Sequence, residues 1–336
     1  MLKLLKAGKK NEKVIITLFI VFLVLVLSLV TRPEEFLGLL ILGLNAMVPI
    51  GMAAVGEILN ERGGQANIGI EGIIIISAFF AVYVAEASGS FLAGICGGVF
   101  IGGFIAFVFA LVATYGRGNQ LIAGFGINMI ALGFVAYFLF TIWNTPGFHI
   151  LSSEELRIPK FITALGSISW IFWAMIVIAV VVYFVMENTR FGMRLKAAGY
   201  NPFVADASGI DVYKIRIAAC TVGGAIVGLA GSYLSLDYLG VVTRDVAQGR
   251  GFIALACLVF SGLDFFLAIE VAFIFGLSEG VGLWLQNLPA AKPFVVHGGG
   301  YFFLMIPYVA VLFTLIVFPR RERLSKMIGE TYKRSE

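Results

Sequence analysis

Long apolar runs alternate with short polar segments along the whole chain. A helix needs about 20 apolar residues to cross the hydrocarbon core of a bilayer, and most of these runs approach that length. The pattern therefore predicts an all-α polytopic membrane protein with about ten transmembrane helices. The predicted crossings cover residues 14–30, 36–59, 68–86, 90–113, 121–141, 167–186, 217–236, 251–263, 265–285 and 302–318.

Three segments depart from a simple alternation of crossings and turns. Residues 14–30 follow a basic N-terminus, as in a signal peptide, but no small-residue cleavage site follows, so they are expected to remain as the first crossing. Residues 142–166 are expected to form a long polar loop. The run at 251–263 is too short for a full crossing, which predicts a tilted, broken or deeply buried helix.

The positive charges indicate the orientation of these crossings. If the ten crossings alternate, 18 of the 24 Lys and Arg residues fall on one side, and cytoplasmic segments carry the excess of such residues. The sequence therefore predicts a multi-pass protein of the cell membrane with cytoplasmic N- and C-termini. The tail at 1–13, the loop at 187–216 and the tail at 319–336 would then lie in the cytoplasm.

The composition excludes several classes of protein. Hydrophobic residues make up 60% of the chain and charged residues 13%, against about 25% charged residues in soluble domains. The polar segments are too short for a water-soluble catalytic domain, so we expect residues 1–336 to form one transmembrane domain surrounded by membrane lipid. The net charge of +4 is spread over short loops and does not indicate nucleic acid as a partner.

The two halves of the chain show the same spacing of crossings. Crossings that start near residues 36, 68, 90 and 121 are followed by crossings that start near 217, 251, 265 and 302, so the offset is close to 180 residues. An odd number of crossings separates the partners, and the halves would therefore have opposite orientations, as in transporters with inverted repeats. The alternative is that any protein of ten crossings has roughly even spacing.

Polar side chains in apolar surroundings concentrate in GEILNERGGQANIGIEG, residues 56–72. A charge at the centre of a bilayer costs on the order of 2.5–3.5 kcal/mol on the insertion scale, so such groups face the bundle interior or a wet path. The alternative to a wet path is a corner of helix packing in which these groups bond to one another. We interpret four groups as the lining of a substrate path: Glu57, Asn67, Glu71 and Asn128.

The loop at 187–216 carries a signal for a short helix exposed to water. Asn201 suits the N-cap, Pro202 the first helical position, and Gly209 the left-handed conformation that ends a helix of about seven residues. Such a helix is unstable alone, and nothing in the chain is expected to cover its apolar side chains. It is typical either of a plug for a partner's groove or of an amphipathic turn that lies on the lipid surface or folds back on its own loops. The residues concerned are Tyr200, Asn201, Pro202, Phe203, Val204, Asp206 and Gly209.

The sequence contains no motif for chemistry of its own. It has no G-x-x-x-x-G-K-[ST] phosphate loop and no H-E-x-x-H zinc motif. The three cysteines lie within predicted crossings, and His149 and His297 are isolated in loops, so we predict no metal site and no catalytic residue. A transporter that lacks an energy source but displays a cytoplasmic docking helix indicates a separate ATPase.

Four segments taken together resemble a known family: GEILNERGGQANIGIEG, NQLIAGFGINMIALG, TRFGMRLKAAGYNPFVADASGIDVYKIR and GRGFIALACLVFSG. In this order, and over most of the chain, they look like the permease subunits of ABC importers of the ribose and branched-chain amino acid type. They are most similar to the branch for nucleosides and other simple-sugar compounds. One departure is SGLDFF at 261–266, where the family usually has small residues and a Pro, so the turn there is expected to differ.

The resemblance implies a permease, without enzymatic activity of its own, that moves nucleosides or related simple-sugar compounds into the cell. It implies three partners: a related second permease that completes a heterodimer, a cytoplasmic ABC ATPase with two fused nucleotide-binding domains, and an extracytoplasmic substrate-binding protein. ATP would be bound by the ATPase, and this chain would hold no cofactor. Residues 200–209 correspond to the coupling helix that docks on the ATPase. The alternative is an ATP-independent secondary transporter or channel for a small polar solute.

Overall fold

The computed structural model describes residues 16–17, 20, 23–29, 31–163, 166–289, 291–317 and 332. Within these residues, eight helices are long and apolar enough to cross a membrane. Another helix, α10 (Arg250–Ser261), is apolar but has only 12 residues, so it spans about 18 Å of a hydrocarbon core about 30 Å thick. The chain is therefore an all-α polytopic membrane protein, as the apolar pattern predicts.

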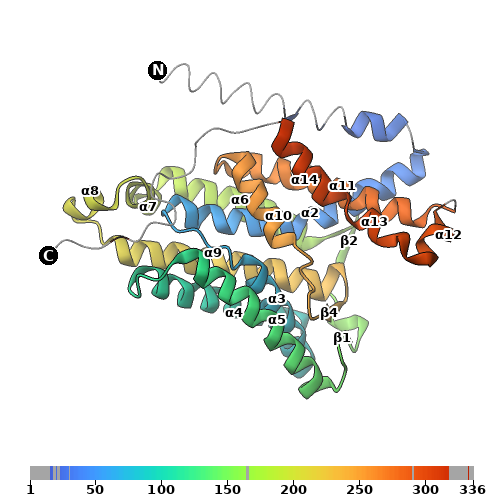
Figure 1. The fold of residues 1–336 in the computed structure, drawn as a ribbon, viewed down its shortest axis with the longest axis horizontal. Coiled ribbons are helices and arrows are strands. Elements are labelled where there is room, and N and C mark those ends of the chain that lie inside the picture. Colours follow the sequence, from blue (N-terminus) through green and yellow to red (C-terminus); the bar gives the residue numbers. More distant parts are fainter. Residues whose placement is uncertain are drawn as a thin grey trace.

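Figure 1 shows the order of the elements along the chain. The long helices are α2 (Pro33–Arg62), α3 (Ile70–Ser88), α4 (Phe91–Thr114), α5 (Gln120–Trp143), α6 (Trp170–Asn188), α9 (Val212–Tyr233) and α11 (Phe265–Asn287). Shorter helices are α7 (Arg190–Tyr200), α8 (Pro202–Ala207), α12 (Lys292–Phe294), α13 (Gly300–Leu304) and α14 (Ile306–Val317). The strands are β1 (Phe148–Ile150), β2 (Lys160–Thr163), β3 (Gly166–Ser169) and β4 (Val241–Thr243).

The predicted crossings between residues 36 and 285 coincide closely with helices of the structure. The first predicted crossing, at 14–30, lies largely outside the described residues, although residues 23–29 are helical. The last crossing is predicted to start at residue 302, whereas the helical run already begins at Lys292. His297 and Gly298 do not have helical backbone angles, and Gly298 has a φ of 90°, which glycine adopts without strain, so the run consists of two helical pieces that meet at a kink.

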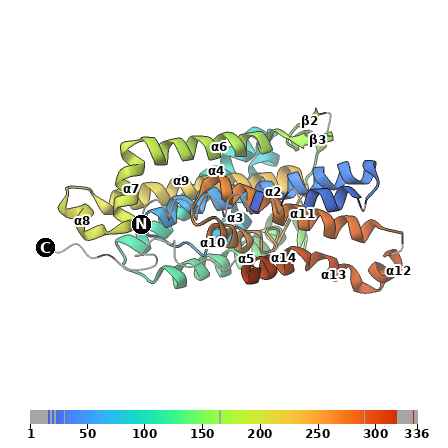
Figure 2. The ribbon, with the colours of Figure 1, turned by 90° about the horizontal axis from the view of Figure 1, so that it is seen from above.

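The polar loops gather at opposite ends of the helix bundle (Figures 1 and 2). α7 and α8 lie at one end, and the strands and α12 lie at the other. The polar loop predicted at 142–166 contains β1, which pairs antiparallel with β4 and places Phe148 opposite Thr243. β2 pairs with β3 in a hairpin. The two segments joined by β1 and β4 are predicted on the same side of the membrane, and their pairing agrees with that prediction.

The helix packing follows the predicted offset of about 180 residues between the halves. In that repeat, α9 corresponds to α2 and α11 corresponds to α4. α4 packs against α9 and α2 packs against α11, so the same contact occurs twice. A Cβ on Gly102 would lie 2.6 Å from the Gly224 carbonyl oxygen. One on Gly276 would lie 2.5 Å from the Gly43 carbonyl oxygen, so both contacts require small residues where backbones approach.

The turn between α10 and α11 contains the SGLDFF segment. Gly262 and Leu263 both have positive φ values, 54° and 63°. A left-handed conformation is uncommon for leucine, and here it reverses the chain without a proline. The Asp264 side chain then accepts a hydrogen bond of 3.2 Å from the Leu267 N–H and caps α11.

Candidate functional site

The predicted docking helix is present as α8, which follows directly on α7. The Asn201 side chain caps it by accepting hydrogen bonds from the N–H groups of Phe203 (3.1 Å) and Val204 (3.2 Å). Pro202 takes the first helical position, where a missing N–H costs nothing. Gly209 follows with a φ of 81°, a value that suits glycine. The local prediction is confirmed, with six helical residues where about seven are predicted.

Apolar side chains of this segment face outward at the end of the bundle. Tyr200 is 67% exposed, Phe203 50% and Val204 61%. The expectation that nothing in the chain covers them is only partly right. The ring centroid of Tyr332 lies 5.0 Å from that of Phe203 and 5.6 Å from that of Tyr213. Half of the Phe203 surface is nevertheless open to a partner.

A buried arginine holds α7 against the transmembrane helices. Arg216 on α9 donates from Nε to the Gly63 carbonyl oxygen (2.8 Å) and from Nη2 to the Ala198 carbonyl oxygen (3.2 Å). The guanidinium therefore joins the glycine-rich turn after α2 to the last part of α7. α7, which directly precedes α8, is therefore held against the transmembrane helices by Arg216.

On α8 itself, Asp206 is partly buried.

A second arginine joins elements at the same end of the bundle. Arg62 donates from Nη1 to Glu187 Oε1 (2.7 Å) and from Nη2 to the Leu263 carbonyl oxygen (2.7 Å). Glu187 also accepts a hydrogen bond of 2.6 Å from Lys196 Nζ. These contacts link the last turns of α2 and α6, the turn after α10, and α7.

Glu57 and Asn67 lie side by side in the buried polar cluster of residues 56–72. Glu57 Oε1 accepts from the Asn67 backbone N–H (2.7 Å), and Glu57 Oε2 accepts from the Asn60 side-chain amide (2.5 Å). The Asn67 side chain accepts from the Gly69 N–H (2.9 Å). These side chains therefore satisfy backbone groups where the chain leaves α2 and enters α3, as a membrane interior requires.

Asn128 reaches the same turn from α5. Its Oδ1 accepts from the Gly72 N–H (2.8 Å), and its amide donates to the Ile68 carbonyl oxygen (3.0 Å). Gln120, also on α5, accepts from the Ala66 N–H (2.7 Å). The structure therefore brings Asn128 to the segment that holds the other three predicted residues.

Glu71 differs from these residues because its partners lie in the other half of the chain. Its Oε1 accepts from the Gly249 N–H (2.5 Å) and its Oε2 from the Gly251 N–H (2.7 Å), so the carboxylate caps the start of α10. A negative charge is favourable at this end of a helix. Bonds among protein groups are what the packing alternative expects for this cluster. The role of the four residues as a lining of the substrate path stays a prediction.

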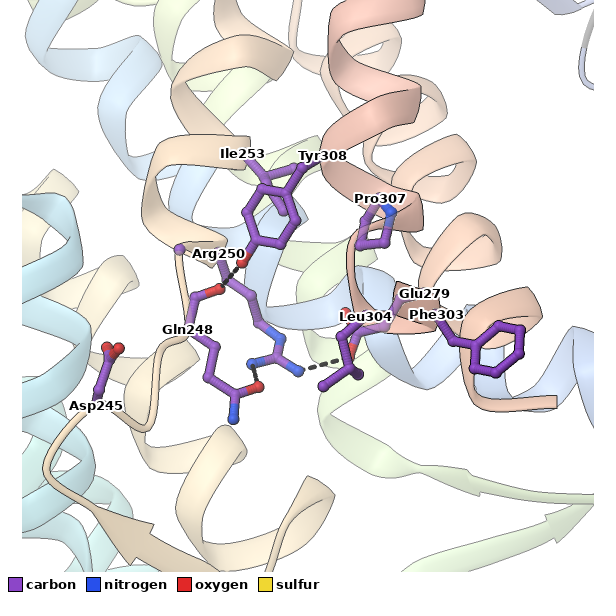
Figure 3. Close-up of a pocket in the computed structure, with 10 residues that line it drawn as sticks. Asp245, Gln248, Arg250, Ile253, Glu279, Phe303, Leu304, Pro307 and Tyr308 are labelled. Atoms are coloured by element: carbon purple, nitrogen blue, oxygen red, sulfur yellow. Dashed lines mark hydrogen bonds and ion pairs between the residues drawn. The ribbon is translucent and has the colours of Figure 1, made fainter. Parts of the chain in front are cut away.

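A cavity of about 340 Å³ lies between the start of α10, the middle of α11, and α13 and α14 (Figure 3). Arg250 donates from Nη2 to Glu279 Oε1 (2.5 Å) and from Nη1 to Gln248 Oε1 (3.4 Å). Glu279 Oε1 also accepts from the Tyr238 hydroxyl (3.0 Å). The Tyr308 hydroxyl donates to the Gln248 carbonyl oxygen. Polar groups from α10, α11 and α14 and from the loop before α10 therefore surround one cavity.

Sequence reasoning misses the pair of Arg250 and Glu279. The charge pattern places Arg250 in an outer polar segment, and Glu279 is one of two carboxylates, with Glu270, in an apolar run. Both residues are buried in the structure. A buried charge needs a partner, but the crossing next to Arg250 offers two carboxylates, those of Glu270 and Glu279, so the sequence does not single out the pair.

Comparison with known proteins shows which family this chain belongs to. A sequence profile described as the permease component of the branched-chain amino acid transport system matches residues 39–317. That range runs from within α2 to the end of α14. The chain is therefore a multi-pass transport permease. It belongs to the family of branched-chain amino acid transport system permease components.

Several relatives narrow this class to ABC transporters. The guanosine ABC transporter permease protein NupQ of Bacillus subtilis is 30% identical over 84% of this chain and 92% of that protein. The nucleoside ABC transporter permease protein NupC of Lactococcus lactis is 28% identical over 86% and 94%. The L-arabinose ABC transporter permease protein AraH of Azospirillum brasilense is 29% identical over 87% and 85%. The chain is accordingly an ABC permease of the nucleoside and simple-sugar branch.

Proposed function

We propose that this chain is the transmembrane subunit of an ATP-driven importer that moves nucleosides, or related simple-sugar compounds, into the cell. The relatives named for guanosine, nucleosides and L-arabinose support this choice of cargo. Their solutes share a hydroxylated sugar ring, and that ring is the chemistry that the permease would admit.

The observation that carries the proposal is the exposed helix α8. An importer driven by a separate ATPase needs a stiff contact through which the motor moves the permease. α8 offers an open apolar surface around Phe203, and Arg216 and Arg62 connect its support to the membrane core. We assign the ATPase contact to Tyr200, Asn201, Pro202, Phe203, Val204, Asp206 and Gly209.

The proposal includes three protein partners and an orientation. A related second permease would form a heterodimer with this chain. A cytoplasmic ABC ATPase with two fused nucleotide-binding domains would bind ATP and dock on α8. An extracytoplasmic binding protein would deliver the solute at the opposite end, where β1 pairs with β4. The excess of Lys and Arg on one side supports cytoplasmic N- and C-termini.

For the transport path we propose that the buried polar cluster forms part of its wall. The cluster lies where the glycine-rich segments before α3 and α10 meet through Glu71. Interrupted helices that meet inside the membrane are typical of binding sites in transporters with repeated halves. A movement of α10 would release the Glu71 carboxylate into the path. The residues are Glu57, Asn67, Glu71 and Asn128.

Reconstitution tests the proposal against an ATP-independent transporter or channel. The purified chain is placed in lipid vesicles alone and, in parallel, with its ATPase, second permease and binding protein. We expect uptake of radiolabelled nucleoside or pentose only in the complete set, and only with ATP. Equal uptake by the chain alone without nucleotide would contradict the proposal and favour the ATP-independent alternative.

A further inference from the structure

The cavity beside Arg250 and Glu279 lies within the thickness of the membrane. The C-terminal end of α10 lies at the same end of the bundle as α7, because the Leu263 carbonyl oxygen accepts a hydrogen bond from Arg62 (2.7 Å). α10 is about 18 Å long, so its first residue, Arg250, falls inside a hydrocarbon core about 30 Å thick. Charged groups at such a depth are costly and are typical of solute pathways.

Several polar groups around the cavity have unused hydrogen-bonding capacity. The described residues give Glu279 hydrogen bonds on Oε1 alone, so its Oε2 is available. The side-chain oxygen of Gln248 accepts from Arg250 and its backbone oxygen accepts from Tyr308, so its side-chain NH₂ group is the part of this residue that can still donate to a ligand. Asp245 lines the cavity and makes no hydrogen bond or ion pair with the described residues.

The remaining wall of the cavity is apolar. Figure 3 shows the Tyr308 ring above Arg250, and Leu304 beside the guanidinium. Ile253, Phe303 and Pro307 complete this side. Apolar walls with a few placed polar groups are typical of sites for small molecules, and a volume of about 340 Å³ falls in their usual range.

The charges around the cavity select among small molecules. Two carboxylates, those of Asp245 and Glu279, line the cavity together with one guanidinium, that of Arg250, so the lining side chains carry one excess negative charge. A phosphorylated or carboxylated solute would meet repulsion there. A neutral ring with several hydroxyl groups can donate to carboxylate oxygens and accept from the Gln248 amide.

We infer that this cavity is a solute-binding site within the permease, where the hydroxylated ring of a neutral nucleoside or of a free pentose is held during passage. The ring's hydroxyl groups donate to Asp245 and Glu279, and its apolar face packs on Tyr308 and Leu304. The inference rests on the proposed function, since it names the site at which that cargo pauses. The bound ring would contact α10, α11 and α14 at once.

Saturation-transfer NMR on the full chain in lipid nanodiscs tests this site without the ATPase or the binding protein. The probes are uridine, D-xylose and uridine 5′-monophosphate. Asp245→Asn and Gln248→Ala alter the site. Glu154→Gln is the matched control, because Glu154 is an exposed carboxylate at the same end of the bundle and does not line the cavity.

We expect signals from the ring protons of uridine, of D-xylose or of both, and none from the monophosphate. Asp245→Asn should weaken binding roughly 10- to 100-fold, since a hydrogen bond to a charged group contributes about 1.5–3 kcal/mol. Glu154→Gln should bind as the unaltered chain does. The inference would be overturned if Asp245→Asn and Gln248→Ala both gave the same signals as the unaltered chain. A monophosphate signal as strong as that of uridine would overturn it as well.

Uptake by the intact importer separates this inference from the proposed function. If the importer takes up uridine or xylose but the nanodiscs give no signal, the inferred binding site is contradicted and the proposed function is retained. Signals that respond to the substitutions, with no uptake of either solute, keep the site and remove the function. Failure of both measurements removes both.

Discussion

The backbone N–H of Gly251 donates a hydrogen bond of 2.7 Å to Oε2 of Glu71, although 180 residues separate the two in the chain. That separation is close to the offset between the halves, and each of the two residues is the second residue of its helix, α3 or α10, so Glu71 and Gly251 hold corresponding positions in the two halves. A Cβ on Gly251 would lie 2.7 Å from Glu71 Oε2, and the contact therefore needs glycine on one side and a carboxylate on the other. The two helices that these residues begin, α3 and α10, are joined at their N-terminal ends.

Glu71→Ala should remove the cap of α10 and leave the Gly249 and Gly251 N–H groups unpaired. The free energy of unfolding should fall by roughly 3 kcal/mol, and the Tm by roughly 5–10 °C. Glu71→Gln, which keeps one acceptor oxygen, should lose about half as much. Intrinsic fluorescence during heating measures the transition, with Glu155→Ala, at an exposed position, as the control.

The same variants decide between the two interpretations of the polar cluster. If Glu71 lines the path, transport by Glu71→Gln should fall well below the level that its amount in the membrane and its Tm predict. If Glu71 only supports packing, uptake per folded molecule should match that of the unaltered chain.

Phe203→Glu should abolish both uptake and co-purification of the ATPase. Phe203 is half exposed, so a charge there should leave insertion and folding unchanged while it prevents burial in an apolar groove of the partner. A pull-down from solubilised membranes measures the complex. Ile162→Glu, an exposed apolar position at the opposite end of the bundle, should retain the ATPase. Retention of the ATPase by Phe203→Glu would exclude α8 as the docking helix.

Arg250→Met should destabilise the chain strongly, because it leaves the Glu279 carboxylate buried without its cation. Breaking a buried pair costs about 3–5 kcal/mol, which corresponds to a fall in Tm of roughly 10 °C or more. The double variant Arg250→Met with Glu279→Leu should recover most of that loss, because no unpaired charge is left. A double-mutant cycle on the Tm measures the coupling. Additive losses in the double variant would show that the pair contributes no coupling.

Arg216→Met should loosen α7 and α8 without removing them from the chain. The Gly63 and Ala198 carbonyl oxygens would lose their donor, at a cost of about 1–3 kcal/mol for each buried group. Hydrogen–deuterium exchange should rise at least tenfold in residues 190–207, because about 1.4 kcal/mol of local stability corresponds to that factor. Lys214→Met, two residues away and exposed, should leave exchange unchanged. Unchanged exchange in Arg216→Met would remove Arg216 as the support of the docking helix.

The crossings and α8 could be predicted because their causes are local. Apolar length marks a crossing wherever it occurs, and Asn201, Pro202 and Gly209 each act on backbone within a few residues. The repeat of the two halves can be predicted for the same reason, because it is a regular spacing between apolar runs. The kink at Gly298 cannot be predicted, because a run of glycines is compatible both with a kink between two helical pieces and with the end of a helix.

The contacts of the candidate sites depend on residues far apart in the chain. Arg250 and Glu279 each look exceptional alone, and only the packing of α10 on α11 brings the opposite charges together. β1 and β4 have three residues each, too few for an alternating pattern to mark them as strands, so their pairing has no local signal. The cover of Phe203 by Tyr332 joins positions more than a hundred residues apart.

Arg62 holds the turn after α10 and, through Glu187, the start of the segment that carries α8. A helix of 12 residues is short enough to tilt as a rigid rod, so a push on α8 that shifts this arginine would tip α10 and swing its far end. That end bears Arg250 and the glycines held by Glu71. α10 would thus transmit movement from an ATPase outside the membrane to the cavity beside Arg250, with the Arg62 guanidinium as the point about which the helix tilts.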